Sequence, residues 1–98
     1  MTINRKENNG AYIYEIEGRI DTLTAPELEA DIKGVADKAE SLLLDFAKVE
    51  YISSAGLRVL LFAHKAMSKK GGLKLVNVGE DIMEIFEVTG FSDILSIE

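Results

Sequence analysis

The chain has 98 residues, of which 47% are hydrophobic and 29% are charged, and its formal net charge is −6 at pH 7. This length and composition predict one domain over residues 1–98 with its own core, and they exclude a disordered or fibrous chain. The acidic balance argues against direct binding of nucleic acid, and the sequence has no cysteine for disulfide or thiol chemistry. No apolar run reaches the ~18 residues of a membrane span, and "MTINRKENNG" lacks the apolar stretch of a signal peptide, so we expect a cytoplasmic protein without membrane insertion.

Two extended segments at the N-terminus are joined by a predicted hairpin turn over Asn8 to Gly10. Asparagine and glycine tolerate the positive φ angles that such turns require. In the second segment Tyr12, Tyr14 and Ile16 share one face, and acidic residues alternate with them. This period of two predicts a strand with one buried face.

The start of the first helix is marked by "LTAPEL". Thr24 is predicted to form a capping box with Glu27, and Leu23 has the right spacing to pack on Leu28 as a hydrophobic staple. Apolar residues then recur at helical spacing. The pattern predicts a helix over Ala25 to Ala39.

Alternating strands and helices are predicted for the rest of the chain. "SLLLDF" is a continuous apolar run, typical of a central strand covered on both faces. A second helix is predicted from Ala55 to Lys70, with Lys69 and Lys70 complementing the dipole of its last turn. "LKLVNV" is predicted to be a strand, "EDIMEIFEVT" a helix capped by Gly90, and "DILSIE" a short strand or frayed tail. The order predicts an α/β fold with a mixed sheet.

The second predicted helix has one apolar face, expected in the core, and one mixed face. The mixed face carries Arg58, Lys65 and Lys69, flanked by Leu61 and Phe62. Apolar groups beside an arginine resemble interface hot spots, so this stripe is a candidate partner surface. The alternative is that the two apolar side chains touch the edge of the sheet and the lysines are merely solvated.

Ser53 and Ser54 lie where a strand gives way to this helix. The first amide N–H groups of a helix lack intrahelical partners and carry about half a positive charge. Ser53 is predicted to be the N-cap. Ser54 is then the first helical residue, and an exposed hydroxyl there is a natural phosphoryl acceptor, because the helix end tolerates added negative charge.

Gly56 needs its own explanation, because glycine early in a helix costs about 0.5 to 1 kcal/mol relative to alanine. Two explanations are open. Either a neighbouring segment packs against its Cα, or another protein must approach the Ser54 hydroxyl closely.

A serine hydrolase or other nucleophilic enzyme is the rival interpretation of Ser54. The only histidine, His64, lies ten residues along the same helix, roughly 15 Å away at 1.5 Å per residue. It is too far to act as the base that a nucleophilic serine needs. The sequence also lacks a nucleophile elbow, a phosphate-binding glycine loop and a metal-ligand cluster, so we expect no catalytic residue, no metal and no cofactor.

Four segments in order resemble the STAS domain, in particular the stand-alone bacterial anti-anti-sigma factors, or anti-sigma factor antagonists. These are "EGRIDTLTAPELE", "LLLDFAKVEYISSAGLRVLL", "GGLKLVNV" and "IFEVTGFSDILSI". The most specific element is D-F-x-x-V-x-Y-I-S-S-A-G-L, from Asp45 to Leu57, and the "G-R-I-D" turn at Gly18 to Asp21 supports it. The resemblance covers nearly the whole chain. It implies a STAS-like fold, with a mixed sheet of four or five strands and helices packed mainly on one face.

The resemblance also implies a partner-switching role. In this family the unphosphorylated antagonist binds an anti-sigma factor that is also a serine kinase, which frees the sigma factor. The kinase phosphorylates a serine at the start of the second helix, the complex dissociates, and a PP2C-type phosphatase restores binding. That serine corresponds to Ser54, and Asp21 and Thr22 match the loop that borders it.

The sequence departs from the family pattern in two places. Ser53 stands where the best-known members have aspartate, which removes a carboxylate beside the acceptor. The chain ends at Glu98, about where many members continue into a last helix, so part of the sheet is expected to be less covered. The expected partner surface consists of Asp21, Thr22, Ser53, Ser54, Gly56, Leu57, Arg58 and Leu61.

Two other functions are alternatives to that of an anti-sigma factor antagonist. One is a STAS accessory subunit of a transport or lipid-trafficking complex, in which Ser54 is never modified. The other is a small enzyme or nucleotide-binding protein, which the missing base, metal site and phosphate loop disfavour.

Overall fold

The protein folds around a five-stranded mixed sheet with the strand order β1-β2-β3-β4-β5. The computed structural model describes residues 1–98. β1 is antiparallel to β2, and each later strand is parallel to its neighbour. The elements are β1 (Thr2–Asn8), β2 (Ala11–Ile20), α1 (Ala25–Ala36), β3 (Ser41–Ile52), α2 (Ser54–Met67), β4 (Leu73–Val76), α3 (Glu80–Thr89), the short 3-10 helix η1 (Phe91–Asp93) and β5 (Ser96–Ile97).

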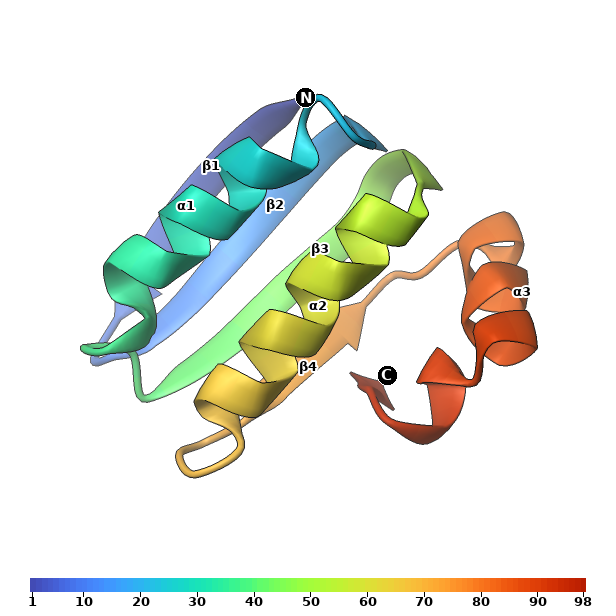
Figure 1. The fold of residues 1–98 in the computed structure, drawn as a ribbon. Helices are drawn as coiled ribbons and strands as arrows, with labels where there is room; N and C mark the ends of the chain where they lie inside the picture. The colour runs from blue at the N-terminus through green and yellow to red at the C-terminus, as the bar shows by residue number, and fades with distance from the viewer.

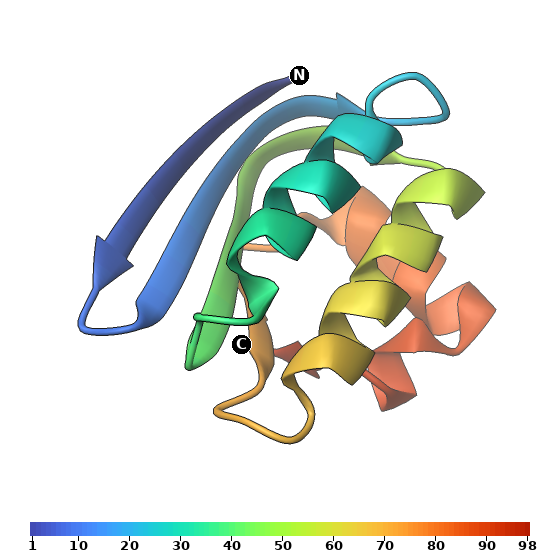
Figure 2. The same ribbon diagram turned by 60° about the vertical axis from the view of Figure 1, so that its left-hand side comes forward.

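The helices cover one face of the sheet (Figures 1 and 2). α1 and α2 lie side by side over the sheet and run roughly along its strands, and α3 lies on the far side of α2 from α1. This arrangement confirms the predicted fold class. The prediction that "SLLLDF" is covered on both faces is wrong, because Leu42 and Leu44 are buried under the helices whereas Leu43 lies only half-buried on the other face. A run of leucines does not by itself reveal that one side of a strand is left open.

The β1–β2 hairpin forms as predicted. Asn9 and Gly10 have φ angles of 52° and 89°, the positive values that the turn requires. Tyr12, Tyr14 and Ile16 are all buried on the helix side of the sheet. The period of two in the sequence therefore gave the correct buried face.

The start of α1 differs from its predicted cap. The Thr24 side chain makes no hydrogen bond to the helix. Its hydroxyl accepts from the Asp21 N–H at 2.8 Å and donates to the Arg19 carbonyl at 2.7 Å, so it braces the preceding loop. Leu23 is 89% exposed and packs on nothing, so the predicted staple on Leu28 is also absent.

Both long helices end three residues before their predicted ends, α1 at Ala36 and α2 at Met67. Lys70 does not complement the dipole of α2. Its Nζ donates to the carbonyls of Ala36, Asp37 and Ala39 at 2.7, 2.9 and 3.2 Å, and so satisfies the C-terminal end of α1. Lys70 thus lies beyond the end of α2 and joins the C-terminal ends of the two helices.

The C-terminal part of the chain completes the core. Gly90 caps the C-terminal end of α3, as predicted. The Phe86 and Phe46 rings lie 6.3 Å apart and join α3 to β3. "DILSIE" contributes the short strand β5 rather than a frayed tail. No helix of the structure has the length and apolarity needed to cross a bilayer.

Gly56 is the point where the first turn of α2 rests on the ends of β2 and β3. A Cβ atom at this position would lie 2.6 Å from Ile52 Cγ1, 2.8 Å from Ile20 Cγ2 and 3.2 Å from the Ile20 carbonyl oxygen. Of the two explanations offered for this glycine, close packing by a neighbouring segment is the one that the structure supports.

We expect Gly56→Ala to lower the free energy of unfolding by about 1 to 3 kcal/mol, because the methyl group overpacks this contact. Urea denaturation followed by circular dichroism measures the effect. The matched control is Gly34→Ala in α1, where an added Cβ meets nothing within 4 Å and where we expect a gain of roughly 0.5 to 1 kcal/mol. Equal stability of Gly56→Ala and the natural protein would show that α2 moves off the sheet at little cost.

Candidate functional site

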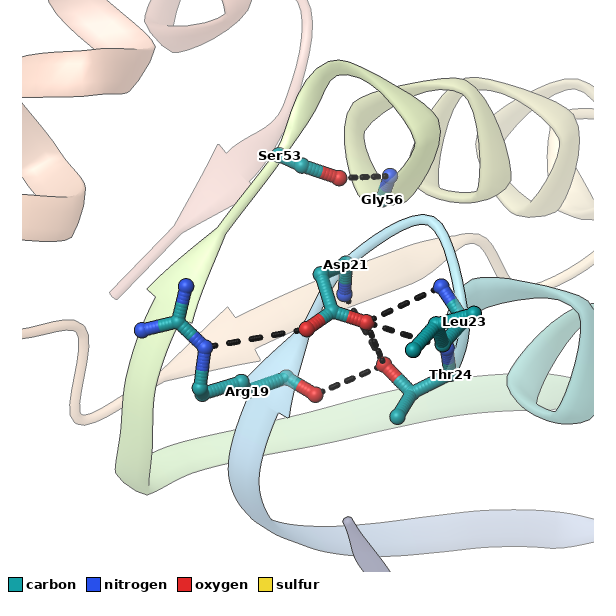
Figure 3. Close-up of polar contacts among 6 residues, drawn as sticks. All are labelled: Arg19, Asp21, Leu23, Thr24, Ser53 and Gly56. Atoms are coloured by element: carbon teal, nitrogen blue, oxygen red, sulfur yellow. Dashed lines mark hydrogen bonds and ion pairs between the residues drawn. The ribbon is translucent and has the colours of Figure 1, made fainter.

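The candidate site lies at the corner where β2 and β3 end and α1 and α2 begin. Parallel strands end at the same edge of a sheet, so the loops that follow Ile20 and Ile52 meet there. The Ser53 N–H donates to the Ile20 carbonyl at 2.8 Å and ties the two loops together. Figure 3 shows Asp21 and its hydrogen-bond partners below the start of α2.

The sequence predicted a turn at "G-R-I-D", from Gly18 to Asp21. This prediction is wrong, because β2 continues through Ile20. The register between β2 and β3 shifts twice, between Glu15 and Glu17 and between Gly18 and Arg19. At each shift β3 carries one residue more than β2, so the irregularities are bulges of β3. The turn itself begins only at Asp21.

Asp21 organises the loop that enters α1. Its Oδ1 accepts from the N–H groups of Leu23 at 3.0 Å and Thr24 at 3.1 Å, and its Oδ2 lies 3.6 Å from Arg19 Nε. The Thr24 backbone N–H, helped by Leu23 and Arg19, lowers the pKa of Asp21 below its usual value. The loop is therefore held in one conformation, with Thr22 and Leu23 exposed at its tip.

The two serines occupy the positions that the sequence predicted. Ser53 is the N-cap, and its Oγ accepts from the Gly56 N–H at 3.4 Å. Ser54 is the first residue of α2, and its side chain is exposed. The hydroxyl of Ser54 thus lies at the positive end of a 14-residue helix, beside the small residue Ala55.

Two residues of the expected partner surface belong to the core instead. Gly56 is buried and Leu57 is only 8% exposed. At 100° per residue both positions of α2 turn toward the sheet and away from solvent. Arg58 is exposed and Leu61 is half-buried, so the outward surface of this turn consists of Ser54 and these two residues.

A shallow groove separates the first turns of α1 and α2. Phe62 lies further along the same helix pair, where Lys33 Nζ stands 5.5 Å from its ring centre. This aromatic ring therefore packs toward α1 and not toward the edge of the sheet. The groove is lined by Thr22, Ala25, Pro26, Glu29, Ala55, Arg58 and Val59.

Sequence reasoning missed a second feature of the corner. The Arg19 guanidinium lies 4.3 Å above the ring of Tyr51, which is 37% exposed. The two residues face each other only because β3 carries an extra residue between Val49 and Tyr51, which places Tyr51 opposite Arg19. No local sequence signal indicates that pairing.

Comparisons with known proteins agree with this fold and site. The STAS domain model matches residues 2–98. The anti-sigma-B factor antagonist of Bacillus subtilis is 33% identical over 98 residues, which cover 99% of this chain and 90% of that protein. An anti-sigma factor antagonist from Mycobacterium paratuberculosis has a crystal structure with a TM-score of 0.87 and 29% identity, covering 98% of this chain and 83% of the other. The Bacillus cell fate determinant SpoIIAA in its phosphorylated form has a TM-score of 0.78 at 13% identity, covering 99% and 91%, and so shares the fold.

The corner between two parallel strands and two helices is thus that of a STAS domain. The chain belongs to the STAS domain family, among its anti-sigma factor antagonists, which are non-enzymatic regulators.

We expect Asp21→Asn to lose stability relative to the natural protein at neutral pH, and the difference to shrink in acid. A carboxylate whose pKa is lowered by folding stabilises the fold above its unfolded pKa of about 3.9, and this contribution disappears as pH falls through the lower folded pKa. Urea denaturation between pH 7 and pH 3 tests this. Asp37→Asn removes the same charge from a carboxylate that accepts no hydrogen bond, and so controls for net charge. A difference that is the same at every pH would contradict the role assigned to the Asp21 carboxylate.

Proposed function

We propose that this protein is a cytoplasmic anti-sigma factor antagonist regulated by phosphorylation of Ser54. The unphosphorylated form binds an anti-sigma factor that is also a serine kinase, and this binding frees a sigma factor. The observation that carries the proposal is the exposed Ser54 hydroxyl at the start of α2, beside the Asp21 loop, in a chain 33% identical to the Bacillus subtilis anti-sigma-B factor antagonist.

The proposed partner surface is centred on Ser54. It includes Thr22 at the loop tip, and Arg58 and Leu61 along α2. Asp21 and Ser53 position these groups, because their side chains are bound to backbone N–H groups of the loop and the helix. A surface held this rigidly loses little conformational entropy on binding.

The switching step is a phosphoryl transfer from ATP, which the kinase supplies. The Ser54 Oγ attacks the γ-phosphorus, the new O–P bond forms, the bond from that phosphorus to the bridging oxygen breaks, and ADP leaves. The hydroxyl proton passes to a base on the kinase. A PP2C-type phosphatase reverses the modification by hydrolysis, in which water attacks phosphorus and the Ser54 oxygen departs as a hydroxyl.

The added phosphate acts mainly on the interface. It brings about −1.5 to −2 charges, which the amide groups at the start of α2 accommodate in the free protein. The SpoIIAA determinant keeps this fold in its phosphorylated form, which is consistent with a small effect on the fold. In a complex the same strongly hydrated group has to be desolvated or has to meet like charge, and ~1.4 kcal/mol already weakens binding tenfold.

We expect a purified cognate anti-sigma kinase with ATP and magnesium to add one phosphoryl group at Ser54. Intact-mass measurement and peptide mapping would detect it. Ser54→Ala should abolish the modification, whereas the neighbouring variant Ser53→Ala should still be modified at Ser54. Calorimetry should show that the phosphorylated protein binds the anti-sigma factor at least about tenfold more weakly.

Two results would contradict the proposal. One is phosphate mapped to another residue, and the other is equal affinity of the anti-sigma factor for both forms. Co-purification with a transporter ATPase, with Ser54 unmodified in the native cell, would favour the accessory-subunit alternative instead.

A further inference from the structure

Arg58 is the base closest in the chain to Ser54 on the exposed face of α2, and its guanidinium has no anionic partner. Both side chains are exposed, and they are four residues apart in the same helix. Residues at i and i+4 lie on one face of a helix, with about 5 to 6 Å between their Cβ atoms. The spacing therefore puts the Ser54 hydroxyl within reach of the Arg58 guanidinium.

The direction of the helix brings the two groups closer still. Side chains in an α-helix lean toward its N-terminus, so the long Arg58 side chain extends over the turn that begins with Ser54. An anion placed N-terminal to a base at this spacing is also the favoured order, because it agrees with the helix dipole. Guanidinium and phosphate match in geometry and form paired charge-assisted hydrogen bonds.

Other charged groups at the corner are already engaged. Arg19 pairs with Asp21 and stacks on Tyr51. Glu29 lines the same groove as Arg58 but lies 3.9 Å from Lys33, four residues further along α1. The base that remains available to a phosphate at the start of α2 is Arg58.

We propose that Arg58 is the intramolecular counter-ion of phosphorylated Ser54. The guanidinium binds the phosphate oxygens along the exposed face of α2, within one protein molecule. The inference rests on the proposed function only in requiring that Ser54 carries phosphate.

The pairing gives the switch a second effect. In the unphosphorylated protein Arg58 is free at the edge of the groove, where it suits an acidic side chain of the partner. After phosphorylation the same guanidinium is held by the phosphate and is withdrawn from that contact. Modification would thus add a negative charge to the surface and remove a positive one from it.

The experiment uses full-length protein with phosphoserine installed at position 54 during translation, so that no kinase is needed. Titration followed by 31P NMR gives the second pKa of the phosphate, which is about 6 without a partner. Pairing with Arg58 favours the dianion and lowers this pKa. We expect Arg58→Gln to raise it by about 0.5 unit and Arg58→Lys, which keeps a point charge without the planar fork, by less.

Lys65→Gln is the matched control. It removes the same charge from the exposed side of α2, eleven residues from Ser54, at about 16 Å along the helix axis. That separation exceeds the Debye length of about 10 Å in 0.1 M salt, so the phosphate pKa should not change measurably. Circular dichroism confirms that the variants remain folded.

Equal shifts in Arg58→Gln and Lys65→Gln, or no shift in either, would overturn the pairing. The titration contains no anti-sigma factor, so its result is independent of the proposed function. Arg58 can pair with the phosphate even if phosphorylation of Ser54 does not change the affinity for the anti-sigma factor. Conversely, phosphorylation of Ser54 can control that affinity even if Arg58 does not touch the phosphate.

Discussion

The contact between Gly56 and the ends of β2 and β3 sets the position of everything at the functional corner. Because Gly56 has no Cβ, the first turn of α2 rests directly on Ile20 and Ile52. This close approach aligns the helix start with the loop after β2, and it leaves Ser54 pointing outward. A glycine that costs helical stability is thus kept by packing, and the accessibility of the hydroxyl is a consequence of that packing.

The corner is rigid, although its chemistry depends on a single exposed hydroxyl. The carboxylate of Asp21 is bound by backbone N–H groups and the hydroxyl of Ser53 by the N–H of Gly56, so these two side chains hold the loops in place. We therefore expect the proposed phosphate at Ser54 to change the surface and hardly to change the fold. Under the proposed function, a small domain without a movable lid can therefore still act as a switch.

Ser53 and Arg58 set the charge around the Ser54 hydroxyl. Ser53 replaces an aspartate, so the start of α2 loses one negative neighbour and keeps a neutral cap. Arg58 adds a cation one turn away. Under the proposed function, both features make the site more favourable to a phosphate dianion, and Arg58 ties the modification to a group that also suits partner binding.

Local signals in the sequence were sufficient to predict the helices and strands, the mixed sheet, the Ser53 cap and the outward position of Ser54. Periodicity and capping depend on residues only one or two helical turns apart in the chain. Contacts between segments far apart in the chain were beyond those signals. The bracing role of Thr24, the stacking of Arg19 on Tyr51, and the binding of Lys70 to the end of α1 depend on strand register and helix packing. The same limit applied to the open face of β3, since burial on both sides of a strand depends on which side the helices cover.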